Sequence, residues 1–232
     1  MSVRPLVVAH RGACRQAREN TLEAFTRARE LGADGIELDV RRTADDVLVV
    51  HHDPDAHPVG MLRAISFAAL RERAPWIPTL AEVLDLCAEW FVNVEVKCLP
   101  WEPDPDPEHE VVRAAADLVR AHPVDVVVSS FDIDTIDALR TYAPEIPTGF
   151  LVYGRDLAAA ASSAARRGHP WLHPDRASTL ADPAAAISTA RAHGLRVDVW
   201  TVDEPEEIRT LAAAGVDAIV TNVPDVALAV LA

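Results

Sequence analysis

Short runs of β-branched and other apolar residues alternate along this chain with Ala- and Leu-rich segments of helical period. The expected strands are residues 6–9, 35–40, 92–97, 126–131, 148–152, 170–173, 197–202 and 218–221. The expected helices are residues 21–31, 80–90, 110–121, 133–142, 157–167, 183–193, 205–214 and 224–231. Eight strands that are each followed by a helix predict an α/β protein with a (β/α)8 TIM barrel, and an open doubly wound sheet is the alternative.

One further strand-like run, residues 47–52, breaks this alternation. Only residues 41–46 separate it from the second strand, which is too short for a parallel crossover, so we expect an antiparallel hairpin arm. With the turn near Asp45, this arm places His52 opposite Leu38 and Asp39. The hairpin extension therefore brings a later histidine to the end of the second strand.

Length and composition are those of one globular domain. The chain has 232 residues, 50% of them hydrophobic, and no flexible linker divides it, so we expect a single domain over residues 1–232. No apolar run is long enough to span a membrane, and residues 1–9 lack the features of a secretory signal. Three scattered cysteines, Cys14, Cys87 and Cys98, suit a reducing compartment. We therefore expect a cytoplasmic protein.

The charge of the chain limits its partners. A formal net charge of -14 disfavours nucleic acids and stable membrane association, because like charges repel. We expect a small-molecule partner, and an anionic one must be bound by local cations or a metal. The sequence leaves the oligomeric state open.

Acidic residues gather at two expected strand ends. Glu37 and Asp39 share one face of the second strand, and Glu95 and Lys97 share a face of the third. In a barrel that face is the interior, and catalytic residues collect at the carboxyl ends of the strands. Three carboxylates there predict a hard divalent cation, Mg²⁺ or Ca²⁺, rather than Zn²⁺. The alternative is a structural salt-bridge network in which Glu95 pairs with Lys97 or Arg11.

Histidines and a cation accompany these acids. His10-Arg11-Gly12 follows the first strand, and His51-His52-Asp53 ends the hairpin arm. Imidazoles, carboxylates and a guanidinium within one short run are the groups that metal-assisted attack on a phosphate ester requires.

Several ordered motifs resemble those of the glycerophosphodiester phosphodiesterases. They are His10-Arg11-Gly12, Glu19-Asn20-Thr21, residues 32–40 (GADGIELDV), residues 43–46 (TADD), residues 49–54 (VVHHDP), residues 77–80 (IPTL), residues 93–97 (NVEVK), Ser130-Phe131, Trp200-Thr201-Val202 and residues 221–224 (TNVP). The resemblance spans nearly the whole chain. It implies a barrel that uses a divalent metal to hydrolyse glycerophosphodiesters to glycerol 3-phosphate and an alcohol.

The resemblance also implies roles for single residues. His10 and His52 would be the acid/base pair, and Glu37, Asp39 and Glu95 would hold the metal. Arg11 and Lys97 would bind the phosphate, and Trp200 would pack against the glycerol carbons. Which histidine is the first base stays open, as does the choice between a cyclic phosphate intermediate and direct attack by water.

Other residues are weaker candidates. We choose His52 over His51 because family spacing places the catalytic imidazole directly before Asp53, and strand alternation turns the two rings to opposite faces. Glu19 is a candidate to support the site by orienting Arg11 or by contacting metal or substrate. Asn20 is a candidate for the same support, and as a helix N-cap. His173, at the sixth strand end, is the third such candidate.

The segment after Lys97, residues 99–108, is proline-rich and acidic, and we expect a solvated connector. A sharper hypothesis is that Trp101 and the neighbouring carboxylates bind a cationic head group such as choline. The segment at residues 53–77, which holds a variable cap in the family, is short in this chain. A short cap predicts an open site for small substrates.

Three residues depart from the family pattern. Arg18 stands where proline is common, Asp46 where glycine is common, and Asn222 where aspartate is common. Because none is a proposed ligand or proton carrier, these departures bear on substrate details and not on activity itself.

Two other functions remain. A lysophospholipase D-like enzyme would need an exposed apolar entry surface near Leu62, Ile65, Phe67 and Leu70. The second alternative is a catalytically inactive barrel that binds phosphate metabolites or a protein. Such a barrel has no physical need to retain all five proposed catalytic and metal-binding residues, which argues against it.

Overall fold

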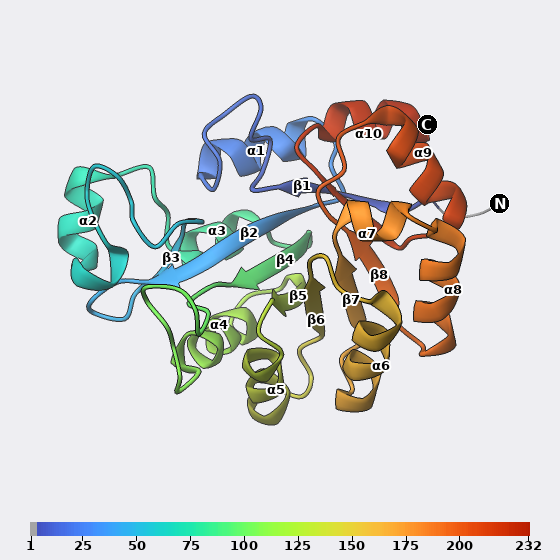
Figure 1. Ribbon diagram of the computed structural model, residues 1–232. Coiled ribbons are helices and arrows are strands. Elements are labelled where there is room, and N and C mark those ends of the chain that lie inside the picture. The colour runs from blue at the N-terminus through green and yellow to red at the C-terminus, as the bar shows by residue number, and fades with distance from the viewer. Residues whose placement is uncertain (1–3) are drawn as a thin grey trace.

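The computed structural model describes residues 4–232, so the first three residues of the expected domain and of segment 1–9 lie outside it. Within these residues, parallel strands form a ring that closes because β1 pairs with both β2 and β9 (Figure 1). The ring contains β1 (Leu6–His10), β2 (Gly35–Arg42), β4 (Phe91–Val96), β5 (Asp125–Ser130), β6 (Thr148–Val152), β7 (Trp171–Pro174), β8 (Arg196–Val199) and β9 (Ala218–Thr221). The expected eight-stranded TIM barrel is confirmed.

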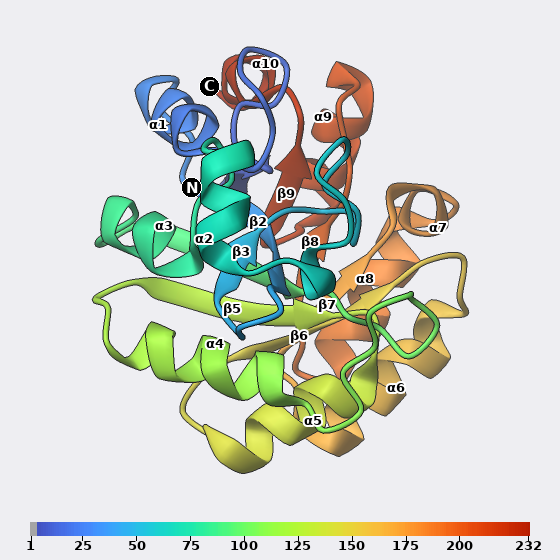
Figure 2. The same ribbon diagram turned by 90° about the vertical axis from the view of Figure 1, so that its left-hand side faces the viewer.

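Helices follow the strands and surround the ring (Figure 2). They are α1 (Leu22–Glu30), α3 (Leu80–Leu86), α4 (Glu110–Arg120), α5 (Ile133–Tyr142), α6 (Leu157–Arg167), α8 (Pro183–Ala192), α9 (Pro205–Ala214) and α10 (Pro224–Leu231). None of the helices within residues 4–232 is long and apolar enough to cross a membrane.

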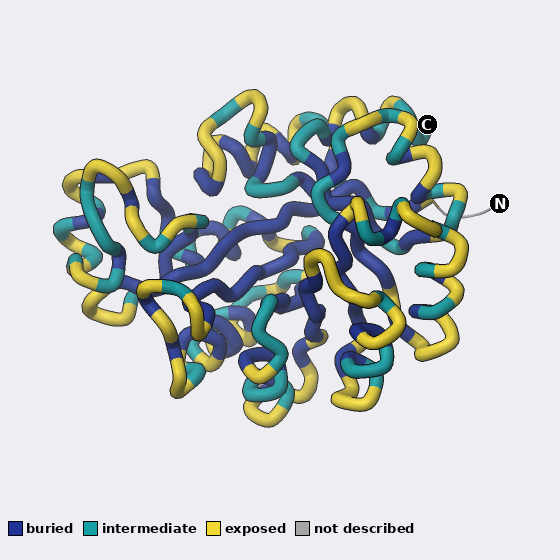
Figure 3. Tube along the Cα trace, in the orientation of Figure 1, coloured by how far each residue is buried: buried dark blue, intermediate teal, exposed yellow. Residues whose placement is uncertain are grey.

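Alternation along the strands produces two apolar layers. Val7 of β1 packs with the apolar faces of the outer helices, whereas the next residue, Val8, packs with Phe91 and Trp171. The rings of Phe91 and Trp171, from strands on different sides of the barrel, lie 6.1 Å apart. Strands are therefore buried on both faces while the helices keep exposed outer surfaces (Figure 3).

The hairpin extension is confirmed with its expected register. β3 (Leu48–Val50) is antiparallel to β2, with Val50 opposite Val40. The His51 amide donates to the Asp39 carbonyl at 2.9 Å, which places His52 beside Leu38. The strand is shorter than residues 47–52 because both histidines lie beyond the regular ladder.

The short cap contains structure that the sequence pattern did not predict. A 3-10 turn, η1 (Leu62–Ala64), and α2 (Phe67–Arg73) lie at the end of the barrel where β2 points (Figure 1). Leu62, Leu70, Val49 and Ile77 form their own small apolar cluster. One short helix, α7 (Arg176–Leu180), was also missed, because a five-residue helix carries little periodic signal.

The acidic segment after Lys97 is not the solvated connector we expected. Asp104 is buried and binds Arg41, whose Nη1 lies 2.9 Å and 3.0 Å from its two carboxylate oxygens. Glu102 binds the same guanidinium, and Asp106 binds Arg42. Two arginines from β2 therefore fold these carboxylates inward, which sequence periodicity does not reveal.

Candidate active site

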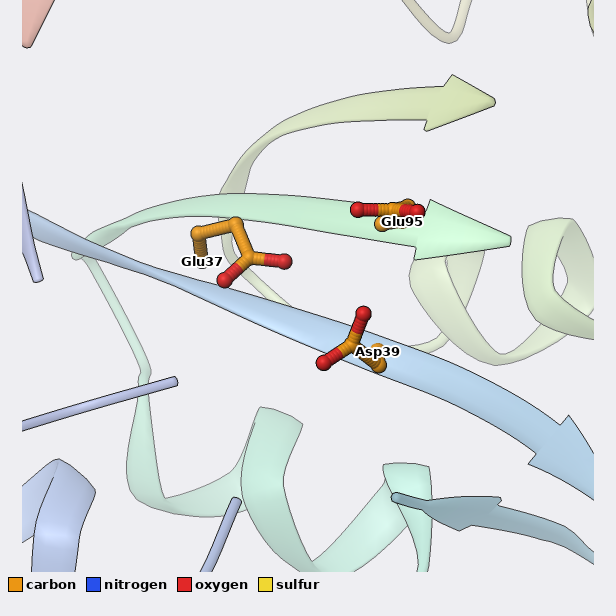
Figure 4. A group of neighbouring side chains, drawn as sticks. All are labelled: Glu37, Asp39 and Glu95. Atoms are coloured by element: carbon orange, nitrogen blue, oxygen red, sulfur yellow. The ribbon is translucent and has the colours of Figure 1, made fainter. Parts of the chain in front are cut away.

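Three carboxylates meet where β2 and β4 run side by side. Glu37 and Asp39 stand on β2, and Glu95 stands on β4 (Figure 4). Asp39 and Glu95 are direct neighbours in the strand register. One oxygen of each carboxylate lies within 4.8 Å of the others, and all three residues are buried. The structure therefore brings together the three acids that sequence reasoning grouped as metal ligands.

Burial and charge act differently on these acids. Burial and the charges of Asp39 and Glu95 raise the pKa of Glu37 well above its usual value. Burial also raises the pKa of Glu95, against the opposing charge of Lys97. Burial acts in the same direction on Asp39, but Lys97 and Arg11 outweigh it and lower the Asp39 pKa to about 2.

Two cations border the acids. Lys97 Nζ lies 2.7 Å from Glu95 Oε1 and 3.5 Å from Asp39 Oδ1. Arg11 lies on the other side, with its Nε 3.2 Å from Asp39 Oδ2 and its backbone amide donating to Glu37 Oε2 at 3.0 Å. Asp39 therefore lies between the two cations.

His10 ends β1 beside this cluster. Its Nε2 lies 3.9 Å from Glu37 Oε2, and its Nδ1 lies 2.8 Å from Asn222 Oδ1. Asn222 is itself fixed, because its side-chain amide donates to Asp203 Oδ2 at 2.8 Å. A carboxamide oxygen can only accept, so His10 carries its proton on Nδ1 and directs an unprotonated Nε2 toward the acids. Burial and Arg11 lower the pKa of His10.

His52 approaches from the hairpin. Its Nδ1 lies 2.7 Å from Asp53 Oδ1, and its ring is partly exposed. The charge of His52 lowers the pKa of Asp39, which places the ring near the acids. Arg41 holds the backbone here, since its Nε donates to the His52 carbonyl at 2.7 Å. The hairpin therefore delivers His52 to the same end of the barrel as His10.

Two supporting candidates lie between α1 and the acids. Asn20 is buried and its side-chain amide donates to Asp39 Oδ2 at 2.8 Å. It is not the helix N-cap that we expected, because Thr21 accepts the capping hydrogen bond from Ala24. Glu19 accepts from Arg11 Nη1 at 2.9 Å, which fits its expected role in orienting that guanidinium.

Trp200 lies just beyond β8, which ends earlier than expected. Its ring meets Phe131 edge to face at 5.4 Å, and both line a cavity of about 370 Å³ that includes Lys97 and Tyr153. His173 does not reach this cavity, because it is 1% exposed inside the barrel. It instead supports Trp200 through its backbone carbonyl, which accepts from the indole Nε1 at 2.9 Å.

Sequence reasoning missed several neighbours of the site. Asn222 was noted only as a departure from a pattern, and neither Asp203 nor Asp53 was assigned a role. Asp53 directly follows the chosen histidine, so adjacency offered a signal. Asn222 contacts His10 from the far end of the sequence, and Asp203 holds Asn222 in place. No local pattern predicts these contacts.

The donor set fits a hard divalent cation. Glu37 Oε1 and Asp39 Oδ1 are buried and accept no hydrogen bond within residues 4–232. Unpaired buried carboxylate oxygens are costly unless a cation satisfies them. Within the described part of the chain the group consists of three carboxylates, without a sulfur or nitrogen ligand, which matches the preferences of Mg²⁺ or Ca²⁺.

Comparison with known proteins gives consistent matches over the chain. A model of the glycerophosphoryl diester phosphodiesterase family matches residues 10–226. A glycerophosphodiester phosphodiesterase of Caldanaerobacter subterraneus subsp. tengcongensis is 31% identical over 240 residues, which cover 96% of each chain.

Solved structures show the same fold. A putative glycerophosphoryl diester phosphodiesterase of Silicibacter pomeroyi has a TM-score of 0.85 and 29% identity, covering 99% of this chain and 93% of its own. A glycerophosphodiester phosphodiesterase of Thermotoga maritima has a TM-score of 0.83 and 26% identity, covering 99% of both chains. The likeness extends over the entire barrel.

Proposed function

Because this chain belongs to the glycerophosphoryl diester phosphodiesterase family and is a phosphodiesterase of glycerophosphodiesters, we propose that it releases glycerol 3-phosphate and an alcohol by metal-dependent histidine catalysis. The observation that carries this proposal is the buried group of Glu37, Asp39 and Glu95, with unsatisfied oxygens, beside His10. Buried carboxylate oxygens without hydrogen-bond donors are costly in a purely structural ion-pair network.

The three acids would hold Mg²⁺ or Ca²⁺. Such an ion, when bound, supplies positive charge that stabilises the charge developing on the phosphate in the transition state. Arg11 and Lys97 add fixed charge to two sides of the same position, and each keeps its proton because the surrounding acids raise its pKa.

His10 is the proposed base. Its Nδ1 proton is bound by Asn222, burial and Arg11 favour the neutral ring, and Nε2 is therefore free to accept a proton from the attacking hydroxyl. His52 is the proposed acid, because the contact between its Nδ1 and Asp53 Oδ1 fixes the ring and leaves Nε2 to deliver a proton to the departing alcohol. This assignment holds for attack by the glycerol 2-hydroxyl or by water.

The cavity beside Lys97 is the proposed place for the glycerol group. Trp200 and Phe131 give it an apolar wall against which the glycerol carbons can pack. His10, His52, Arg11 and Lys97 then surround the phosphate between this cavity and the hairpin.

The test is glycerol 3-phosphate release from a panel of glycerophosphodiesters. EDTA should abolish release, and add-back of Mg²⁺ or Ca²⁺ should restore it. His10→Gln and His52→Gln should each lose release while circular dichroism stays unchanged. His193→Gln, an exposed histidine at the end of α8, is the matched control. Full activity in EDTA or in either catalytic variant would contradict the mechanism.

The lysophospholipase D-like alternative receives no support from the cap. Leu62 and Leu70 are buried, and Ile65 and Phe67 pack against the same apolar cluster. No exposed apolar entry surface therefore forms at these four residues, and small glycerophosphodiesters remain the favoured substrates.

We also propose a cytoplasmic location and a single domain. Cys14, Cys87 and Cys98 are all free, which suits a reducing compartment. Cell fractionation tests the location, because activity should be found in the cytoplasmic fraction. Limited proteolysis tests the single domain, because it should yield no stable sub-fragments.

A further inference from the structure

A small cavity lies beside His52, separate from the one beside Lys97. It has a volume of about 120 Å³. Its lining residues include His51, His52, His57, Arg18 and Trp76. Since His52 is the proposed proton donor to the departing alcohol, the alcohol must lie on this side of the phosphate. The inference that follows therefore rests on the proposed function.

Arg18 and Trp76 form one wall of this cavity. The guanidinium carbon of Arg18 lies 4.3 Å from the centre of the Trp76 ring. Stacking on tryptophan fixes the position of a guanidinium without neutralising its charge. Among the ion pairs within residues 4–232, none includes Arg18.

The carboxylate in the cavity wall and the one that follows His52 are both engaged. Glu19, the acid in the cavity wall, binds Arg11 Nη1 at 2.9 Å. Asp53, which follows the catalytic histidine, binds His52 Nδ1 at 2.7 Å. The cavity is thus left with an uncompensated guanidinium and imidazole rings, and no free carboxylate in its wall can receive a cationic group.

We propose that Arg18, held by Trp76, makes this the alcohol subsite and selects glycerophosphodiesters whose alcohol carries an anionic group. A quaternary ammonium group is disfavoured there. This preference is opposite to the cationic head group considered for Trp101, whose neighbours Glu102 and Asp104 are bound to Arg41.

Three synthetic esters of glycerol 3-phosphate test the proposal. Their alcohols have similar size and differ in charge: 3-hydroxypropanoate is anionic, 1,3-propanediol neutral and 3-aminopropanol cationic. At low ionic strength the wild-type enzyme should give the anionic ester a kcat/KM about tenfold above that of the cationic ester. Added salt should reduce this ratio, because Arg18 is exposed to solvent.

Variants locate the origin of the preference. Arg18→Gln should lower the anionic-to-cationic ratio about fivefold, mainly through a lower kcat/KM for the anionic ester. Arg73→Gln is the control, since it removes the same charge from an exposed position on α2 that does not line the cavity. Trp76→Leu should lower the ratio as Arg18→Gln does, whereas Trp76→Phe should retain most of it.

The outcomes separate the two proposals. Equal cleavage of all three esters, preference for the cationic ester, or an unchanged ratio in Arg18→Gln would overturn the role of Arg18 while hydrolysis itself stands. Failure to release glycerol 3-phosphate from any ester, the neutral one included, would overturn the proposed function, and this inference with it.

Discussion

Strand β2 carries two buried charged clusters that differ in one respect. The first contains Glu37 and Asp39, and it keeps buried oxygens without hydrogen-bond partners. The second is centred on Arg41, whose nitrogens bind Glu102, Asp104 and the His52 carbonyl. Both clusters are buried and both join β2 to the segment that contains or follows β4. The first is unsatisfied and fits a ligand, whereas the second is satisfied and fixes a loop.

Burial of charge does not by itself mark a functional site. Buried ion pairs with complete hydrogen bonding position structure, and only atoms left without partners indicate a missing ligand. The two clusters are also connected, because Arg41 holds the backbone of the proposed acid His52. The satisfied cluster therefore supports the unsatisfied one.

The largest effect is expected in the unsatisfied cluster. Glu37→Gln removes one of the three carboxylates that would bind the metal, so glycerol 3-phosphate release should fall at least about a thousandfold. Stability to urea in EDTA should not fall, because the variant relieves repulsion among buried acids. Retained activity, or a loss of stability comparable with that of an Arg41 variant, would erase the distinction between the clusters.

Arg41→Met should give the reverse pattern. Asp104 would be left buried without its cation, which should lower the free energy of unfolding by about 3–5 kcal/mol in urea titrations. Arg113→Met, an exposed position on α4, serves as the control. Activity should also fall, but less than in Glu37→Gln, because the His52 carbonyl would lose its hydrogen bond from Arg41. An Arg41→Met protein as stable as wild type would show that the satisfied cluster does not fix the loop.

Asp198 tests whether unsatisfied oxygens suffice to indicate function. Both its oxygens are buried without partners, and burial with the charge of Asp217 raises its pKa to about 7. A raised pKa means that the folded state binds the proton more tightly, so this contribution to stability is fully present below the ordinary aspartate pKa and is lost as pH rises from there to about 7. The wild-type free energy of unfolding should fall by about 2–3 kcal/mol more than that of Asp198→Asn between pH 5 and pH 8.

Activity should separate Asp198 from the metal-binding acids. Because Asp198 is not part of the group formed by Glu37, Asp39 and Glu95, Asp198→Asn should leave glycerol 3-phosphate release unchanged. A loss as large as that of Glu37→Gln would mean that unsatisfied oxygens mark function even without clustering.

The smallest effect concerns His10. The base works when its ring is neutral, so activity falls as pH drops through the His10 pKa, which lies below its usual value. Asn222→Asp places a carboxylate at Nδ1 and should raise that pKa, shifting the acidic limb of the pH–rate profile upward by about one unit. An unmoved profile would mean that His10 is not the titrating base.

Much of the fold was predictable because it depends on local periodicity. The strand β2, with Glu37 and Asp39 on one face, and the hairpin register that delivers His52 both follow from alternation and a short turn. Alternation does not by itself separate His51 from His52, since both residues line one cavity after the strand ends at Val50.

The barrel and the grouping of Glu37, Asp39 and Glu95 could be predicted from the amino-acid sequence, because both depend on strand period, whereas the roles of His10 and His52 were implied by resemblance to a family. Which charges are satisfied could be seen only in the folded chain: Arg41 by Glu102 and Asp104, His10 by Asn222, and Arg18 by no carboxylate within residues 4–232. The physical reason is that hydrogen bonds and ion pairs depend on distances in space, and residues far apart along the chain meet only after the ring of strands has closed.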